Sequence, residues 1–522
     1  MMKTSASRVG WLFLFLLVLA SSWAREVSIT ILSTTDLHGH ILADKPTEPG
    51  GLARCATLIR QTRATEKNVL LVDAGDTIQG TAESWLSGGQ VMVRALNALR
   101  YDAWVLGNHE FDWGLEKLTN CIARAEMPVL AANLSGLARV QPFVMREVDG
   151  VKVAIVGLTT PGIPNWSRPR LIPGLQFADS VETLRKVLPA AREGGAQVFV
   201  LVVHQGYKEG GDDHANQIRA IAERFPELSV IIGGHTHRDF NGFRVSGVLY
   251  NQAGFHGQRV GRVDLVFDTE QGKVTSRQSR TVEADASVAA DEAVVALARE
   301  DLDRAEKYLA TPLGEAADAF PTRGGPKRET PVHDLLCGAI AGALERRGVK
   351  VDAVVHGLLN ARETLAKGPV TVRDVWRIVP YENTVGVARL TLAQLREILD
   401  EDAGTYDKHE FRGVWGLRWR FDPRSAEGSR VLELRRGNGA AVEEGERLAV
   451  AFNSYELASG GLKWKKLREL ADLPETKLVE YDVSTREALM EEIRQKRVVT
   501  PQIEGWWQAE DFHRRGRKPV AQ

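Results

Sequence analysis

Cysteine is scarce in this chain: only three occur among its 522 residues, at Cys55, Cys121 and Cys337. An odd and widely spaced set argues against a disulfide framework of the kind that stabilises small secreted domains. Each cysteine lies among helix-forming residues, so we expect three buried free thiols. A chain of this length can bury full hydrophobic cores without such cross-links.

Net charge is also missing, because 67 lysines and arginines nearly cancel 68 aspartates and glutamates and leave a formal charge of −1. The chain therefore has no overall basic field with which to attract a nucleic-acid polymer or an anionic membrane surface. An anionic small molecule has to be attracted locally, by metal ions or by a few arginines. Nothing in the sequence indicates an oligomeric state.

Long hydrophobic runs are absent beyond the first residues. There, Lys3 and Arg8 precede an apolar run at 11–20, and Ser22-Trp23-Ala24 places small residues at cleavage-type positions. This pattern is typical of a secretory signal peptide, and the run is short for a transmembrane helix. We predict that residues 1–24 are a cleaved signal peptide and that the mature chain, periplasmic or secreted, has no membrane span.

Short runs rich in Val, Ile and Leu recur through the first half of the chain, as is typical of buried strands. They lie at 27–32, 69–72, 103–106, 129–131, 153–156, 198–203 and 229–232. Helical stretches separate several of them, at 52–63, 90–99 and 215–224. This alternation predicts an α/β fold whose strands are covered by helices.

A charged, alanine-rich stretch at 289–309 contains neither proline nor glycine and predicts a linking helix. The string Thr-Arg-Gly-Gly-Pro at 322–326 then interrupts the helical pattern. We expect a first domain over 25–285, a linking segment over 286–326 and a second α/β domain over 327–522.

Five of the predicted strands end within a few residues of Asp, Asn or His. The polar residues at these ends are Asp36, His38, Asp76, Asn108, His204, His235 and His237. Because ligands bind beyond the carboxyl ends of strands in open α/β sheets, we expect these side chains to converge on one point.

The chemistry of this set indicates metal binding. Imidazole nitrogens with carboxylate and amide oxygens, and no thiolate, suit Zn²⁺, Mn²⁺, Fe or related ions. Seven candidates exceed the four ligands of one tetrahedral ion. They suit two divalent ions that share one carboxylate, and such a pair holds both the attacking and the leaving oxygen of an in-line displacement.

The order of these motifs resembles the calcineurin-like metallophosphoesterase superfamily. Longer strings resemble its 5′-nucleotidase family, such as Thr-Thr-Asp-Leu-His-Gly at 34–39, Gly-Asp-Thr-Ile-Gln-Gly at 75–80 and Gly-Asn-His-Glu-Phe-Asp-Trp-Gly at 107–114. That family includes UDP-sugar hydrolases and 2′,3′-cyclic nucleotide phosphodiesterases. The resemblance extends over roughly residues 27–510. It implies an αββα-sandwich metallophosphoesterase domain followed by an α/β substrate-binding domain.

The resemblance also implies roles at the metal site. It assigns Asp36, His38 and His237 to one ion, Asn108, His204 and His235 to the other, and Asp76 to both. His109 stands where the family has a catalytic histidine, and Asp112 where it has the carboxylate that orients this histidine. We therefore expect His109 to stabilise the transition state or to protonate the leaving oxygen.

The second domain resembles the family less closely. The family's Asn-Gly-Gly-Gly-Ile-Arg signature corresponds to His-Gly-Leu-Leu-Asn-Ala-Arg at 356–362, which keeps the arginine but few of the glycines. Leu462 stands where the family has an aspartate that contacts ribose hydroxyls. The predicted substrate-binding residues are Tyr381 and Tyr455, which would stack on a base, together with Asn383 and the anion-binding Arg362 and Arg328.

We therefore expect a secreted two-metal enzyme that hydrolyses nucleotide phosphomonoesters to nucleoside and phosphate. The same chemistry on 2′,3′-cyclic nucleotides, UDP-sugars or a non-nucleotide phosphoester stays open. A catalytically silent nucleotide-binding protein is a further alternative, although the complete ligand set argues against it. The expected partner is a small phosphoester, with no nucleic-acid polymer.

Overall fold

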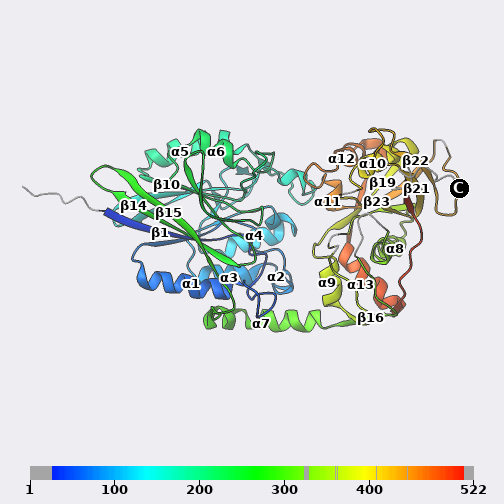
Figure 1. Ribbon diagram of the computed structural model, residues 1–522, viewed down its shortest axis with the longest axis horizontal. Helices are drawn as coiled ribbons and strands as arrows, with labels where there is room; N and C mark the ends of the chain where they lie inside the picture. The colour runs from blue at the N-terminus through cyan, green and yellow to red at the C-terminus, as the bar shows by residue number, and fades with distance from the viewer. Residues whose placement is uncertain are drawn as a thin grey trace, which may run out of the picture.

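The computed structural model describes residues 26–322, 329–358, 360, 362–406, 408, 410–443 and 445–510. The predicted signal peptide and Arg328 lie outside these residues. Figure 1 shows two domains side by side, joined along one edge by the long helix α7 (Glu292–Leu309). In the described part of the chain, no helix combines the length and the hydrophobicity that crossing a membrane requires.

Two β-sheets form the centre of the first domain, with the strand orders β15-β14-β1-β2-β3-β4-β6 and β12-β13-β11-β10-β8-β7. The strands that lead into the site are β1 (Glu26–Thr34), β2 (Val69–Asp73), β3 (Ala103–Val105), β10 (Val198–Val203) and β11 (Val230–Ile232). The remaining strands are β4 (Val129–Leu130), β6 (Val140–Gln141), β7 (Phe143–Val148), β8 (Val151–Leu158), β12 (Asp239–Val245), β13 (Val248–Ala253), β14 (Arg259–Asp268) and β15 (Lys273–Glu283). The site strands run parallel to their site neighbours within each sheet, so their carboxyl ends share an edge.

The two sheets pack face to face through a core that the strands themselves supply. Ile29 and Ile31 of β1 share this core with Val200 and Val202 of β10, and all four are buried. Successive side chains of a strand point to opposite faces, so positions two apart face the core together. The intervening positions are left to face the helices outside.

Helices cover the outer face of each sheet. The first sheet is covered by α1 (Leu52–Thr65), α3 (Gln90–Ala98), α4 (Gly114–Arg124) and α7, and the second by α5 (Ser180–Glu193) and α6 (Ile218–Arg224). The predicted αββα sandwich is therefore confirmed. Cys55, Cys121 and Cys337 are buried and unpaired, as expected.

The linking segment belongs structurally to both domains. Asp291 caps α7 by accepting a hydrogen bond from the backbone N–H of Val294, and Val294 and Ala298 pack into the core of the first domain. Ion pairs to Asp291 and Asp301 from Arg60 and Arg94 hold the helix against α1 and α3. The chain then enters β16 (Pro312–Ala316), which pairs with strands of the second domain.

The second domain is built on a mixed sheet with the order β20-β17-β23-β19-β24. Its strands are β20 (Val414–Trp415), β17 (Ala353–Val355), β23 (Arg447–Asn453), β19 (Thr384–Thr391) and β24 (Val479–Ser484). On one side lie α8 (Pro331–Glu345), α9 (Val372–Ile378) and α13 (Thr485–Lys496), and on the other α10 (Leu392–Ala403) and α12 (Lys465–Ala471). Two three-stranded sheets flank it: β18 (Gly368–Thr371) with β16 and β25 (Val498–Val499), and β21 (Leu417–Phe421) with β22 (Val431–Arg436) and β26 (Trp507–Ala509).

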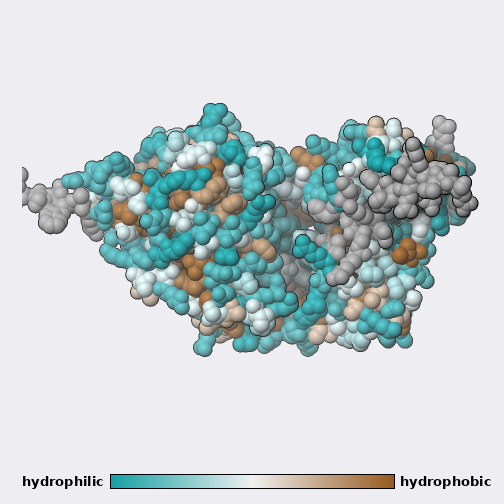
Figure 2. All heavy atoms as spheres, in the orientation of Figure 1, coloured by the Kyte–Doolittle hydropathy of each residue, from teal (hydrophilic) through white to brown (hydrophobic). Residues whose placement is uncertain are grey.

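Polar contacts fix the second domain against the first. Arg168 is buried, and its guanidinium lies 3.0 Å from Glu480 and 2.8 Å from Asp472 across the interface. Near the site, Glu382 accepts hydrogen bonds from Gln79 at 3.2 Å and from Trp113 at 3.1 Å. On the face shown in Figure 2, the surface is hollowed between the two domains, and hydrophobic residues are scattered.

Candidate two-metal active site

The seven predicted ligands come from loops at strand ends of both sheets. β1, β2 and β3 supply Asp36, His38, Asp76 and Asn108, and β10 and β11 supply His204, His235 and His237. Two sheets stacked with their carboxyl ends together bring the same residues to one place.

Five of these residues occupy the left-handed region of backbone conformation. Their φ angles are 50° at Asp36, 47° at His38, 54° at Asp76, 71° at His235 and 54° at His237. A residue with a Cβ adopts this conformation at a cost of order 1–3 kcal/mol, and such residues cluster at functional sites. A side chain is excluded at Gly107, because a Cβ there would lie 2.2 Å from Oδ1 of Asp76.

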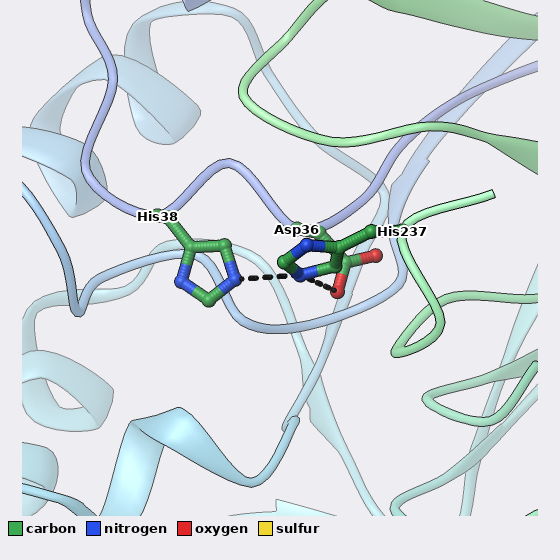
Figure 3. A group of neighbouring side chains, drawn as sticks. All are labelled: Asp36, His38 and His237. Carbon is green, nitrogen blue, oxygen red and sulfur yellow. Dashed lines mark hydrogen bonds and ion pairs between the residues drawn. The ribbon is translucent and has the colours of Figure 1, made fainter. Parts of the chain in front are cut away.

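One group of ligands consists of Asp36, His38 and His237, whose ligand atoms all lie within 4.8 Å of one another. Figure 3 shows the two imidazoles with their Nε2 atoms facing each other, 3.1 Å apart, and His237 Nε2 lies 3.4 Å from Asp36 Oδ1. Nδ1 of His38 lies 3.1 Å from the carbonyl oxygen of Gln79. That bond fixes the ring and leaves Nε2 to bind a metal.

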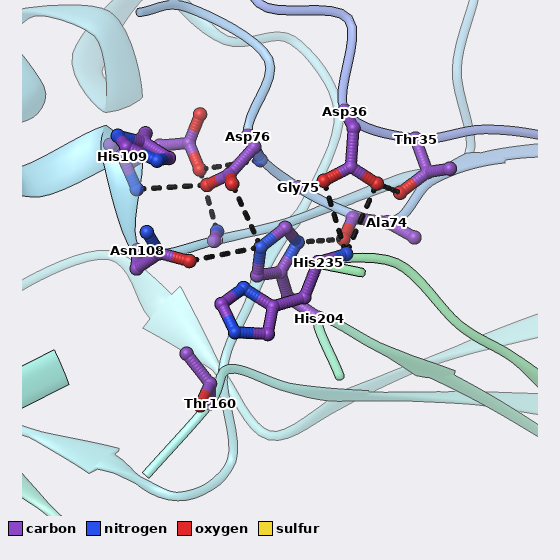
Figure 4. Close-up of polar contacts among 12 residues, drawn as sticks. Thr35, Asp36, Ala74, Gly75, Asp76, Asn108, His109, Thr160, His204 and His235 are labelled. Carbon is purple, nitrogen blue, oxygen red and sulfur yellow. Dashed lines mark hydrogen bonds and ion pairs between the residues drawn. The ribbon is translucent and has the colours of Figure 1, made fainter. Parts of the chain in front are cut away.

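The second group consists of Asp76, His204 and His235, again with ligand atoms within 4.8 Å of one another. His204 Nδ1 contacts the carbonyl oxygen of Ala74 at 2.8 Å, so Nε2 is directed at Asp76 Oδ2, 3.0 Å away. Asn108 Oδ1 lies 3.2 Å from the same Nε2 atom, as Figure 4 shows. The amide oxygen thus belongs to this second group.

The donor atoms fit two divalent ions. Oδ2 of Asp76 lies 3.0 Å from Nε2 of His204 and 3.9 Å from Nε2 of His38, so one carboxylate borders both groups. Nitrogen and oxygen donors without sulfur suit Zn²⁺, Mn²⁺ or similar ions. The assignment of individual ligands to each ion stays a prediction.

Protonation also suits metal binding. Burial lowers the pKa of His38 and lowers that of His235 to about 3, so both imidazoles are neutral. Burial opposes ionisation of Asp36 and Asp76, but neighbouring histidines outweigh it and hold both pKa values below the usual range. Burial also opposes protonation of His204, but Asp76 outweighs this effect and raises the pKa of His204 to about 9. A metal must therefore displace a proton there.

Glu110 organises the loops that carry the ligands, a role that sequence reasoning missed. Its buried carboxylate accepts backbone hydrogen bonds from Gly107 at 2.6 Å, Asp76 at 2.9 Å and Thr77 at 2.7 Å. It thereby ties the loop after β2 to the loop after β3. Its place in the Gly-Asn-His-Glu string was the available signal.

His109 lies beside the metal ligands and is held from two sides. Its Nδ1 lies 2.7 Å from Oδ2 of Asp112, and its backbone N–H donates to Oδ1 of Asp76 at 2.8 Å. Burial opposes protonation of its imidazole, but Asp112 and Asp76 outweigh this effect and hold the pKa well above the usual value. The ring lies 5.2 Å from that of His38 and nearly parallel to that of Tyr381, 6.0 Å away.

A cavity of about 350 Å³ connects this chemistry to the second domain. Its lining includes Asn108, His109, Asp112 and His235 from the first domain and Tyr381, Asn383 and Tyr455 from the second. Arg362 is exposed and does not line it, so the structure does not place that arginine with the other predicted residues. Trp166, Arg412, Glu456 and Lys463 also line the cavity, and sequence reasoning did not single them out.

A third polar group borders the first ligand group. The rings of His40 and His256 stack at 3.7 Å, and Asp44 lies 3.1 Å from His40 Nε2 and 3.7 Å from His256 Nδ1. The ring of His256 is 5.7 Å from that of His38. Asp44 thus fixes the orientation of two imidazoles that pack behind the metal ligands.

Comparison with known proteins identifies the class. Residues 29–239 match the calcineurin-like phosphoesterase family, and residues 310–469 match the 5′-nucleotidase C-terminal domain. Fold and site together define a metal-dependent phosphoester hydrolase that uses two divalent ions. The chain thus combines, in this order, a calcineurin-like phosphoesterase domain and a 5′-nucleotidase C-terminal domain.

Several characterised proteins are similar to it. The 2′,3′-cyclic-nucleotide 2′-phosphodiesterase/3′-nucleotidase of Haemophilus influenzae is 28% identical over 73% of this chain and 68% of its own length. The trifunctional nucleotide phosphoesterase of Bacillus subtilis is 25% identical over 93% of this chain, which spans 39% of that protein. The crystal structure of a 5′-nucleotidase precursor from Thermus thermophilus superposes with a TM-score of 0.71, at 25% identity, over 92% of this chain and 99% of its own.

Proposed function

We propose that this chain hydrolyses nucleoside monophosphates to nucleoside and phosphate. The observation that supports this most directly is the cavity that is lined both by His109 and His235 of the first domain and by Tyr381 and Tyr455 of the second. A nucleotide has this same division, with a phosphate to be cleaved at one end and a flat base at the other. Aromatic rings hold such bases by stacking.

At the phosphate end, two bound ions would supply hydroxide near neutral pH and neutralise charge on the phosphoryl oxygens. The chain itself contributes an orienting pair, in which Asp112 fixes the ring of His109 through Nδ1. Nε2 of His109 then donates a proton or a hydrogen bond to the departing oxygen. One such positioned acid contributes about 10²–10⁴-fold to the rate.

A second candidate is the hydrolysis of 2′,3′-cyclic nucleotides with subsequent removal of the 3′-phosphate. Relatives from Haemophilus influenzae and Salmonella typhimurium carry that name, each 28% identical to this chain. A base bound between the same tyrosines would present a different ribose edge to the metals. UDP-sugars and non-nucleotide phosphoesters are further candidates. A relative from Bacillus subtilis is named an endonuclease, but a cavity of about 350 Å³ favours a small molecule over a polymer.

A substrate panel tests the proposal. Purified protein is stripped with a chelator, reconstituted with Zn²⁺ or Mn²⁺, and assayed with AMP, 2′,3′-cyclic AMP, 3′,5′-cyclic AMP, UDP-glucose and p-nitrophenyl phosphate. We expect activity to vanish without metal and AMP to be the best of these substrates. Good cleavage of p-nitrophenyl phosphate beside no cleavage of AMP would reject the nucleotidase function and leave the phosphoesterase class intact.

We also propose that the protein acts outside the cytoplasm. The support is the basic and apolar pattern of residues 1–24, which lie outside the described structure. N-terminal sequencing of the native protein should begin at Arg25. Recovery of an intact Met1 in the cytoplasmic fraction would contradict export.

A further inference from the structure

The second-domain end of the cavity contains an arginine with unused donors. Arg412 is 2% exposed, and its Nε and backbone N–H donate to Oδ1 of Asp402 at 3.1 and 3.0 Å. Its guanidinium carbon lies 4.7 Å from the ring centre of Trp464, which stabilises the flat group from one face. Nη1 and Nη2 have no hydrogen-bond partner among the residues that the structure describes. A buried guanidinium with two unpaired donors calls for a partner, and Arg412 is among the residues that line the cavity.

An unused acceptor lies beside these donors. Glu456 is 1% exposed and accepts a hydrogen bond from the backbone N–H of Gly357 through Oε1, at 3.1 Å. Within the described part of the chain, its Oε2 has no hydrogen-bond partner, and neither has the nearby Nδ2 of Asn453. Gly357 lies beside both groups. A Cβ there would lie 3.5 Å from Cγ of Arg412 and 3.7 Å from Oε1 of Glu456.

The charges around this point do not favour a second anion. Arg412 is paired with Asp402, and Nζ of Lys463 lies 3.4 Å from Oε1 of Glu410. Glu456 adds a further carboxylate, so the described groups leave no excess positive charge for a phosphate or carboxylate. A neutral, flat group with two adjacent acceptors and a neighbouring donor would satisfy the two free nitrogens of Arg412 and Oε2 of Glu456.

We propose that Arg412 and Glu456 recognise the edge of a 6-oxopurine base, so that the enzyme prefers GMP and IMP to AMP. Guanine and hypoxanthine present N7 and O6 as adjacent acceptors, which suit a bidentate arginine, followed by an N1–H donor for the carboxylate. Adenine presents a donor at N6 between two acceptors and mismatches both groups. This inference rests on the proposed nucleotidase function and specifies its substrate.

The test compares substrates within each enzyme, so that loss of folded or metal-loaded protein cancels. The readout is the ratio of kcat/KM for GMP to that for AMP, in metal-reconstituted full-length protein. We expect a ratio of about ten or more in the wild type, the scale of a bidentate arginine contact to a purine. Arg412→Lys removes the planar fork but keeps a cation for Asp402, and Glu456→Gln removes the free acceptor. Each should lower the ratio about tenfold.

A matched control is Arg430→Lys, because Arg430 pairs with Asp400 at 3.1 Å in the same domain and does not line the cavity. It should keep the wild-type ratio. A wild-type ratio near one, or a ratio that survives both Arg412→Lys and Glu456→Gln, overturns the inference.

A second measurement separates this inference from the proposed function. Guanosine and adenosine are compared as inhibitors of p-nitrophenyl phosphate hydrolysis, which requires no nucleotide turnover. Stronger inhibition by guanosine, weakened in Glu456→Gln, supports base recognition even if no nucleotide is hydrolysed. Equal inhibition by the two nucleosides overturns it even if AMP and GMP are both good substrates.

Discussion

Asp76 and His109 are in contact but have different tasks. Asp76 borders both ligand groups through Oδ2, whereas its Oδ1 accepts the backbone N–H of His109. The ring of His109 is instead held by Asp112 and faces the cavity that leads to Tyr381. Removing either side chain should therefore damage different properties of the enzyme.

His109→Ala should lower kcat by about 10²-fold or more, because a positioned acid is lost, while metal content stays near that of the wild type. Asp76→Ala should lose both activity and metal, since the carboxylate of Asp76 borders both ligand groups. Elemental analysis and steady-state kinetics on the same samples distinguish the two outcomes. If His109→Ala kept the kcat of the wild type, the catalytic role of His109 would be refuted and its role would be structural.

Glu456 provides a prediction about pH and stability. Burial raises its pKa from 4.5 to about 7, although Arg412 and the backbone N–H of Gly357 oppose this, and Asp402 adds to the rise. The folded state therefore binds a proton that the unfolded state has released, and wild-type stability falls as pH rises from about 4.5 through 7. Glu456→Gln has no such proton. The variant should gain about 1–3 kcal/mol relative to the wild type between about pH 5 and pH 8.

Thermal unfolding of the wild type and of Glu456→Gln at about pH 5 and about pH 8 measures this gain. The melting temperature of the variant minus that of the wild type should be larger at the higher pH. The comparison cancels any constant cost of the amide, because that cost is the same at each pH. Identical pH dependence of variant and wild type would show that Glu456 titrates normally in the folded protein.

At the scale of elements, the metal ligands lie on the loops that follow the strands and not on the strands themselves. β2 and β3 end before Asp76 and Asn108, and the intervening turns depend on left-handed backbone at Asp76 and on a glycine at 107. The strand-end positions of the ligands were predictable because apolar runs stop visibly in the sequence. Glu110 was harder to predict, because its partners are backbone N–H groups, which every sequence has.

Glu110→Gln should weaken metal binding without touching a metal ligand. The amide replaces one accepting oxygen by a donor, which leaves buried backbone N–H groups of the ligand loops unpaired. Groups that orient metal ligands typically contribute about 10–100-fold to metal affinity. Competition with a chromogenic chelator measures this loss, with Glu116→Gln on the exposed face of α4 as the matched control. Equal affinity in both variants would show that the loops hold their shape without Glu110.

At the scale of the whole molecule, the first domain was easier to predict than the cavity. The metal ligands follow sequence motifs, whereas the substrate end depends on how residues distant in the chain meet. Arg412 and Glu456 are brought together beside Gly357 only by the folded second domain. Arg362 was predicted from a motif that this chain has altered, and it lies exposed and outside the cavity lining.

The two-domain site leads to a final prediction about Tyr381. Tyr381 is 39% exposed and lines the cavity, and its ring lies nearly parallel to that of His109, which leaves the other face available to a base. Tyr381→Ala should raise KM for AMP by about ten- to a hundredfold, the usual range for one lost stacking platform. Hydrolysis of p-nitrophenyl phosphate should change far less, since that substrate carries no base. Tyr381→Phe keeps the ring, so its KM for AMP should stay near that of the wild type. Equal losses on both substrates in Tyr381→Ala would instead mean that the ring acts by supporting His109, and the base would then bind without it.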